Sequence, residues 1–343
     1  MIKQIECRGT PCQIGITHGS QAAPEIARCI EFYAALFQKT SKRSWPEVLE
    51  TAKLFDAEIK AQWPRFHEEM RGIAEGAKSD LLDIIALNVR TEIAFGLFSD
   101  GCTSLSWRTP SHEFLGQNWD WQTSQSPNLI ALTIHQPSLP TIKILTEAGI
   151  IGKISLNSQG VGLCFNAIRA TGVSMTRMPV HLGLRTVLES FSTAQAVNVL
   201  KEVGMASSAH ILIVDSTGDA VGLEFTNSSF ATAPELNNKI IHSNHLLAQH
   251  DGVVEPPWLE DSPQRIVRMN ELTEKVGDDP SWTDFSAVFE DGGGFPASIC
   301  RTEEGGSTFA TLFNIVMDLK ARRAVAKMGR PVEPTETIEF RFE

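Results

Sequence analysis

The sequence of 343 residues lacks any run of apolar residues long enough to cross a lipid bilayer. Its first six residues also lack the apolar core of a secretory signal peptide. There is no excess of positive charge, because 41 acidic residues outnumber 30 basic ones and give a net charge of −11. These absences argue against a membrane protein, and against nucleic acid or an anionic membrane surface as a partner.

Cysteine is sparse and scattered along the chain. The six cysteines show no Cys-x-x-Cys spacing, which fits reduced intracellular thiols better than a disulfide framework. The glycine run at 292–294 is not followed by Gly-Lys-Ser/Thr, so it is interpreted as a loop and not as a phosphate-binding site. The final tripeptide, Arg341-Phe342-Glu343, differs from the peroxisomal import signal. We therefore expect a cytosolic protein.

The first hundred residues have the pattern of helices. Apolar residues recur among small and polar ones over 13–38, which predicts one helical stretch. Ser44 followed by Glu47 is typical of a helix start, and apolar residues then continue at helical spacing. A further capped helix is predicted at 81–87, after Asp80. This part of the chain is expected to be mainly helical.

After Gly101 the pattern changes to short alternating segments separated by turn residues, which is typical of strands. Strands are predicted at 102–107, 114–119, 129–135, 142–146, 151–157, 161–166, 209–215, 220–226, 239–243, 309–317, 324–328 and 337–342. Helices are predicted at 180–190, 193–203, 263–275 and 283–290. This order predicts an α+β fold of antiparallel sheets covered by helices, with the helical start sharing the same core.

Cys102 is the first candidate for chemistry. It follows Gly101 at the start of a predicted strand, and a thiol beside a glycine carbonyl has what an N-to-S acyl shift requires. Hydrolysis of the resulting thioester would free an α-amino group with a pKa of about 7.7–8.0, a ready base for the thiol. The structural alternative is a buried cysteine after a turn.

Polar residues elsewhere in the predicted strands offer further candidates. Asp120 lies one hairpin away from Cys102, so the two residues can meet across neighbouring strands, although a turn-capping role is also open. Asn244 offers an amide donor for an oxyanion hole. His242 suits a Cys–His pair or, with His245, a zinc site, but no third ligand is evident and no metal is expected.

The sequence closely resembles the isopenicillin N acyltransferase (acyl-CoA:6-aminopenicillanic acid acyltransferase) family of N-terminal-nucleophile enzymes. The resemblance runs from Arg8-Gly9-Thr10-Pro11 to Arg341-Phe342. The stretches that carry it include Arg71-Gly72-Ile73-Ala74, Asp100-Gly101-Cys102-Thr103, Gly116-Gln117-Asn118-Trp119-Asp120, the run 146–153, Gly222-Leu223-Glu224-Phe225, Asn244-His245, Ser298-Ile299-Cys300-Arg301 and the run 310–315.

The resemblance implies an αββα four-layer sandwich and self-cleavage between Gly101 and Cys102. The products would be subunits 1–101 and 102–343, which stay together as partners around one core. It also implies that Cys102 is the nucleophile, that Asn244 lies at the oxyanion, and that Asp120 lies near the amine-bearing substrate. Ser307 matches a family serine linked to activity, and no cofactor is implied.

Two positions depart from the family pattern near the substrate. Penicillin-forming members carry an arginine, thought to meet the penam carboxylate, where this chain has Thr308; its loss removes a contact worth about 1.5–3 kcal/mol. An aromatic pair after the family's Trp-Asp becomes Trp121-Gln122, which makes part of the acyl pocket polar. We therefore expect Asp120, Trp121, Ser307 and Thr308 to contact substrate, with the acceptor's identity open.

The sequence thus predicts a self-processing cysteine acyltransferase that uses an acyl-CoA and 6-aminopenicillanic acid or a related amine or amide. The rival function on the same fold is an amidohydrolase acting on N-acyl amino acids or peptides. A rival of another class is an inactive paralogue that acts as a binding protein, which an uncleaved but folded chain would favour.

Overall fold

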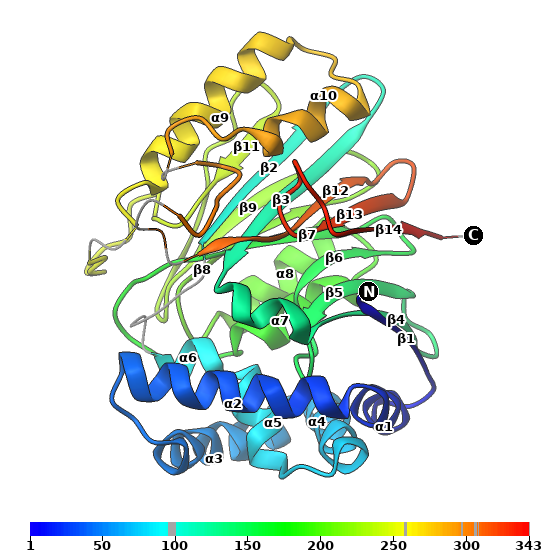
Figure 1. Cartoon of the computed structure of the whole chain (residues 1–343), viewed down its shortest axis with the longest axis vertical. Helices are drawn as coiled ribbons and strands as arrows, with labels where there is room; N and C mark the ends of the chain where they lie inside the picture. Colours follow the sequence, from blue (N-terminus) through cyan, green and yellow to red (C-terminus); the bar gives the residue numbers. More distant parts are fainter. Residues whose placement is uncertain (95–100, 257–258, 296–297, 305–306, 308, 343) are drawn as a thin grey trace.

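The computed structural model describes residues 1–94, 101–256, 259–295, 298–304, 307 and 309–342. Two β-sheets lie face to face at the centre of the molecule, and helices cover their outer sides (Figure 1). The first helices of the chain gather at one end of the molecule, where the blue and cyan segments lie below the sheets (Figure 1).

The helices fall into three groups along the chain. The first group is α1 (Pro11–Gln21), α2 (Ala23–Thr40), α3 (Trp45–Gln62), α4 (Pro64–Ala77), α5 (Leu81–Asn88) and α6 (Arg90–Ala94). The second is α7 (Val180–Leu188) and α8 (Thr193–Val203), and the third is α9 (Ser262–Val276) and α10 (Trp282–Ala287). Two 3₁₀ turns, η1 (Thr123–Asn128) and η2 (Val288–Glu290), complete the set in the described residues.

The larger sheet has eight strands in the order β1-β4-β5-β6-β7-β8-β9-β10. Their bounds are β1 (Lys3–Arg8), β4 (Leu129–His135), β5 (Ile142–Glu147), β6 (Ile154–Asn157), β7 (Gly162–Ala167), β8 (Ala209–Val214), β9 (Ala220–Phe225) and β10 (Phe230–Thr232). The smaller sheet has the order β11-β2-β3-β12-β13-β14. Its strands are β11 (Lys239–His242), β2 (Gly101–Arg108), β3 (Glu113–Trp121), β12 (Ala310–Asp318), β13 (Arg323–Met328) and β14 (Glu336–Arg341).

The layers are held by two hydrophobic clusters, one on each side of the six-stranded sheet. The larger cluster fills the space between the sheets and continues into the first helices, with Phe37, Trp119 and Leu145 among its members. The smaller lies between the six-stranded sheet and α9 and α10, where Phe114 stacks on Phe285 at 4.7 Å between ring centroids. Helices α7 and α8 contact the eight-stranded sheet. The layer order is therefore αββα, as the resemblance implied.

The helical start of the chain contains a break that the sequence pattern did not predict. A single stretch over 13–38 was expected, but α1 ends at Gln21 and α2 begins at Ala23. Pro24 lies in the first turn of α2, where a missing N–H costs nothing; within a continuous helix it would remove a hydrogen bond and clash with the preceding turn. The prediction of one helix was therefore wrong. The predicted start at Ser44 is confirmed, because Ser44 and Glu47 form a capping box.

The strand predictions are confirmed, with ends that shift by up to three residues. Two strands were missed, β1 and the three-residue β10. Strand β1 pairs in parallel with β4, so the expectation of purely antiparallel sheets was wrong at this edge. The partners Ile5 and Leu132 are 127 positions apart, and no local pattern could have joined them.

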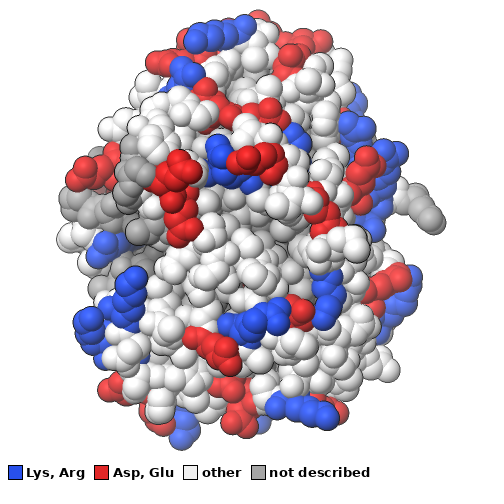
Figure 2. Space-filling view, in the orientation of Figure 1, with Lys and Arg blue, Asp and Glu red and all other residues white. Residues whose placement is uncertain are grey.

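The surface carries both signs of charge. On the face shown in Figure 2, Lys and Arg side chains lie interspersed with Asp and Glu side chains. In the described part of the chain, no helix is long and apolar enough to span a membrane.

Candidate active site

Cys102 lies at the start of β2 and is fully buried. In the register of β2 with β3, Cys102 pairs with Trp119 and Gly101 pairs with Asp120. Because side chains alternate across a strand, Cys102 and Trp119 face the core between the sheets, whereas Asp120 faces the α9 side. The strand at Gly101–Cys102 therefore has the apolar core between the sheets on one face and the α9 side on the other.

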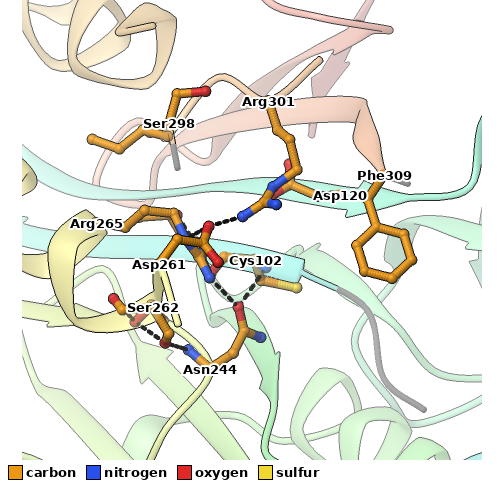
Figure 3. A network of polar contacts seen from close by, with 12 residues as sticks. Cys102, Asp120, Asn244, Asp261, Ser262, Arg265, Ser298, Arg301 and Phe309 are labelled. Atoms are coloured by element: carbon orange, nitrogen blue, oxygen red, sulfur yellow. Dashed lines mark hydrogen bonds and ion pairs between the residues drawn. The ribbon is translucent and has the colours of Figure 1, made fainter. Parts of the chain in front are cut away.

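The main chain of Cys102 is held at both its nitrogen and its oxygen (Figure 3). Its N–H donates to Asn244 Oδ1 at 2.9 Å, and its carbonyl accepts from Arg265 Nη1 at 2.5 Å. The same guanidinium nitrogen reaches Thr103 Oγ1 at 2.9 Å, and Nη2 donates to Asn244 Oδ1 at 2.8 Å. Both donors to Asn244 therefore meet its oxygen, and its Nδ2 donates to the Ala167 carbonyl at 3.0 Å. This pattern fixes which way the amide points.

Arg265 is completely buried at the start of α9, and burial lowers the pKa of its guanidinium, an effect that nearby Asp120 and Cys102 oppose. Its Nε donates to Asp261 Oδ2 at 3.1 Å, one turn earlier. Arg301 also donates to Asp261 and lies 3.6 Å from Asp120 Oδ2. Two arginines and two carboxylates therefore form a neutral quartet beside Cys102, which compensates for the cost of burying each charge.

Asp120 is fully buried and is oriented by β12. Its Oδ1 accepts a hydrogen bond from Thr311 Oγ1 at 2.7 Å. That hydroxyl oxygen also accepts from the main-chain N–H of Arg301 at 3.0 Å. Gly101 allows this approach, because a Cβ at its position would lie only 3.2 Å from the Asp120 side chain.

The backbone of Asn244 is anchored to the first turn of α9. Its N–H donates to Ser262 Oγ at 2.7 Å, and Ser262 Oγ also lies 2.7 Å from His245 Nδ1. Burial, followed by the charges of His242 and Arg265, lowers the pKa of His245 to about 4, so this ring is neutral at pH 7. A cavity of about 230 Å³ opens beside Asn244, lined also by Glu255 and Leu259.

A cluster of aromatic side chains lies at the same end of the six-stranded sheet as Cys102. Trp121 stacks on Phe309 at 5.3 Å between centroids and meets the edge of Phe32 at 6.3 Å. Phe32 belongs to α2, so both parts of the chain contribute to this group. Figure 3 shows the Phe309 ring on the side towards which the Cys102 sulfur points.

Comparison with known proteins places these residues in a family. Residues 107–333 match the model of the acyl-coenzyme A:6-aminopenicillanic acid acyl-transferase family. The chain is 42% identical, over 344 aligned positions, to the acyl-coenzyme A:6-aminopenicillanic-acid-acyltransferase 40 kDa form of Emericella nidulans; the match covers 98% of this chain and 96% of the relative. The chain belongs to this acyltransferase family.

Solved structures of low identity also align with the chain. A variant of the conjugated bile acid hydrolase of Clostridium perfringens aligns with a TM-score of 0.49 at 14% identity, over 70% of this chain and 92% of that one. Penicillin V acylase of Agrobacterium tumefaciens aligns with a TM-score of 0.45 at 12% identity, over 70% and 86%.

The fold of this family member brings together three of the residues singled out from sequence. Cys102, Asp120 and Asn244 lie in one network, although 142 positions separate Cys102 from Asn244. Trp121 stands beside them in the aromatic group. Ser307 instead closes a local turn, where its hydroxyl donates to the Phe309 carbonyl at 2.8 Å. Thr308 lies outside the described residues.

The contacts of His242 and His245 do not fit a Cys–His pair or a zinc site. His242 engages Ser243 O at 2.9 Å and Glu224 Oε1 at 2.7 Å, so both ring nitrogens have partners other than Cys102. His245 pairs with Ser262. Across the described ranges, no group of three His, Cys, Asp or Glu side chains has the geometry of a metal site.

Sequence reasoning missed the residues that hold the acyltransferase network together. Arg265, Asp261 and Ser262 fell in or beside a segment interpreted only as a helix of the second part of the chain. Asp261 and Arg265 are four positions apart, as in many exposed helical ion pairs, which gave no sign that both face the interior. Only the packing of α9 against β11, the neighbour of β2, brings Arg265 to Cys102.

Proposed function

We propose that this acyltransferase cuts its own chain between Gly101 and Cys102 and then transfers acyl groups through a Cys102 thioester. The observation that supports this most directly is the hold on the Cys102 main chain. Its nitrogen bonds to Asn244 and its carbonyl to Arg265, so the peptide next to the thiol is fixed before any reaction. Fixed geometry of this kind lowers the entropic cost of an intramolecular attack.

The cleavage begins when the Cys102 sulfur attacks the Gly101 carbonyl carbon. The C–N bond breaks, the nitrogen gains a proton, and the Gly101 acyl group passes to sulfur as a thioester. Water then hydrolyses the thioester, which leaves a carboxylate on Gly101 and a free thiol and α-amine on Cys102. Because Gly101 has no side chain, the peptide can distort and the sulfur can approach.

In turnover, the new α-amine removes the thiol proton and the thiolate attacks the carbonyl of an acyl-CoA or an amide. The Asn244 amide N–H is assigned to the oxyanion of the tetrahedral intermediate. The leaving thiol or amine departs with the proton. An acceptor amine then attacks the thioester and restores the thiol. Following the name of the relative from Emericella nidulans, acyl-CoA and 6-aminopenicillanic acid are the first donor and acceptor to test.

The two fragments stay together in this proposal because buried polar contacts cross the cleavage site. Glu147 Oε2 pairs with Arg90 at 3.1 Å from one fragment and with Lys153 at 2.6 Å from the other. Its Oε1 accepts from Tyr33 at 2.5 Å. Burial by itself would raise the pKa of the Glu147 carboxyl, but the two cations hold it below its ordinary value. Separation of the fragments would break these hydrogen bonds and ion pairs. It would also expose a large apolar core to water, which is unfavourable.

The acceptor's own carboxylate needs a cation, and the nearby candidates already have partners. Arg301 is paired with Asp261 and Asp120, and Lys153 with Glu147. With threonine at position 308, we expect weak use of 6-aminopenicillanic acid, and Thr308→Arg should raise kcat/KM by about ten-fold, near 1.4 kcal/mol. Steady-state kinetics on both forms with one acyl-CoA decide this. Saturation of the native protein at micromolar acceptor would contradict it.

Mass spectrometry of the purified protein tests the cleavage. We expect two fragments, 1–101 and 102–343, the second beginning Cys-Thr-Ser. Cys102→Ala should remain one chain, because alanine offers no nucleophile. Cys164→Ala is the matched control, since Cys164 is equally buried in β7, and it should be cleaved normally. Cleavage that persists in Cys102→Ala would exclude the mechanism.

Partition of the acyl-enzyme distinguishes acyltransferase from amidohydrolase turnover. The processed protein is given one acyl-CoA, with and without 6-aminopenicillanic acid or other amines. New amide that grows with amine concentration at the expense of free acid supports transfer. A ratio of free acid to amide that no amine changes would assign the site to hydrolysis.

A further inference from the structure

A buried carboxylate outside the site described above forms hydrogen bonds with the chain on both sides of Asn244. Glu224, on β9, is fully buried. Its Oε1 accepts from His242 Nε2 at 2.7 Å and from the main-chain N–H of Leu247 at 2.8 Å. Its Oε2 accepts from the N–H of Ala248 at 2.9 Å and lies 3.4 Å from His250 Nε2. Four nitrogen atoms therefore surround one carboxylate.

The hydrogen bonds fix the orientation of the His242 ring against Glu224. His242 Nδ1 lies 2.9 Å from the Ser243 carbonyl, which can only accept, so Nδ1 carries a proton. Burial by itself would raise the pKa of Glu224, but the His242 hydrogen bond and charge hold it below its ordinary value. Glu224 is therefore a carboxylate that accepts a hydrogen bond from His242 Nε2, and the His242 ring lies between this carboxylate and the Ser243 carbonyl.

A neutral histidine completes the packing. The rings of His210 and His242 stack at 3.6 Å between centroids with 10° between planes. Burial and the charge of His242 hold the pKa of His210 well below its ordinary value, so the stacked ring stays neutral. Its Nδ1 is held by Asn166 Oδ1 at 2.9 Å. The His242 ring is thus held from β8 as well as from β9.

The residues that are hydrogen-bonded to Glu224 lie on both sides of Asn244 in the chain. His242 lies two positions before it, and Leu247 and Ala248 lie three and four positions after it. None of the hydrogen bonds of Glu224 reaches Cys102, Asp120 or Arg265. A carboxylate that holds both sides of a short segment fixes the position of the residue between them.

We propose that the hydrogen-bonded pair of Glu224 and His242 positions the Asn244 amide for acyl transfer. This rests on the role proposed above for Asn244 at the oxyanion. Glu224 touches no reacting atom, so it is a positioning residue, and its whole effect on turnover passes through Asn244.

A double-mutant cycle on processed protein tests this. Glu224→Gln removes the charge and turns an amide N–H₂ towards main-chain donors, so we expect kcat to fall by about 10- to 100-fold with KM little changed. In an Asn244→Ala background the same change should lower kcat by less than about two-fold. Glu92→Gln is the control, because Glu92 is a buried carboxylate that accepts from the Val180 N–H and the Ser207 hydroxyl, away from Asn244. It should leave kcat unchanged.

A second variant covers the case in which Glu224→Gln fails to fold. His242→Gln keeps a donor to Glu224 and removes the ring that stacks on His210, so it should give a smaller loss of kcat that also disappears in the Asn244→Ala background. Equal losses of kcat in both backgrounds would overturn the proposal, as would a full rate in both variants. If Asn244→Ala alone is fully active, the oxyanion assignment fails, and that result differs from a failure of the positioning role of Glu224 and His242.

Discussion

At the scale of single residues, Arg265 connects several parts of the site through one side chain. One buried guanidinium joins the Cys102 carbonyl, Thr103 Oγ1, Asn244 Oδ1 and Asp261. A planar fork with several donors can hold these acceptors at once, whereas a lysine ammonium cannot. Arg265→Lys should therefore slow cleavage and lower kcat by about 10- to 100-fold, equivalent to one charged hydrogen bond of about 1.5–3 kcal/mol.

The rate at which fragment 102–343 appears, and kcat on the processed protein, measure this effect. Arg268→Lys is the matched control, since Arg268 lies three positions further along α9 and pairs with Asp291 and Glu271 at the surface. It should behave like the native chain. Similar losses in both variants would mean that Arg265 acts only through the stability of α9.

Asn244 is tested by removing its amide. Asn244→Ala should lower turnover of the processed protein by about 10²–10³-fold, the usual effect of losing one oxyanion donor. Since the same side chain accepts from the Cys102 N–H, cleavage must be scored separately from turnover. A near-normal kcat would leave Asn244 with a structural role only.

At the scale of elements, the packing of α1 against α4 depends on four glycines. Along α1, Gly15 and Gly19 face α4, and along α4, Gly72 and Gly76 face α1. A Cβ on Gly15 would lie 2.0 Å from the Glu69 carbonyl oxygen, and one on Gly19 would lie 2.2 Å from that of Ile73. The two backbones are therefore in direct contact, and no side chain can move aside to make room.

Gly15→Ala should consequently lower the free energy of unfolding by about 3 kcal/mol or more, because overpacking against backbone cannot relax locally. Denaturant unfolding followed by circular dichroism measures the change. Gly292→Ala serves as the control, since nothing lies within 4 Å of a Cβ at that position, and it should change stability by less than about 0.5 kcal/mol. A neutral Gly15→Ala would mean that α1 and α4 separate easily.

At the scale of the whole molecule, we expect the contact between the two proposed fragments to depend on pH. His18 Nε2, in α1, accepts the Gly149 N–H at 3.0 Å, which requires a neutral ring. Burial, together with Arg185, lowers the pKa of His18 from 6.5 to about 3. A group with a lowered folded pKa contributes stability that is present above its unfolded pKa of 6.5 and is lost as the pH falls towards 3.

We therefore expect the stability difference between the native protein and His18→Gln to shrink on acidification. Glutamine can accept the same N–H without titrating, so the native protein should lose stability relative to the variant by up to about 1.4 kcal/mol per pH unit in that range. Denaturant unfolding of both proteins at intervals between pH 7 and pH 3 measures the difference. Parallel curves for the two proteins would show that His18 does not titrate on unfolding.

The sequence by itself determined the features that depend on neighbouring residues. Ser44 and Glu47 predicted a helix start, and alternating apolar residues after Gly101 predicted the strands. Both signals depend only on residues a few positions apart. The place of Cys102 after a glycine, and of Asp120 one hairpin later, indicated a nucleophile and its neighbour. Resemblance to a family then supplied the layer order and the candidate role of Asn244.

Only the tertiary structure decided what surrounds those residues. Arg265 reaches Cys102 across 163 positions, and the parallel pairing of β1 with β4 joins distant segments. A pattern over a few residues records which faces are apolar, but it does not record which buried charge meets which partner. The orientation of Asn244 and the network around it are therefore properties of the packed molecule, since their partners come from β2, β7 and α9.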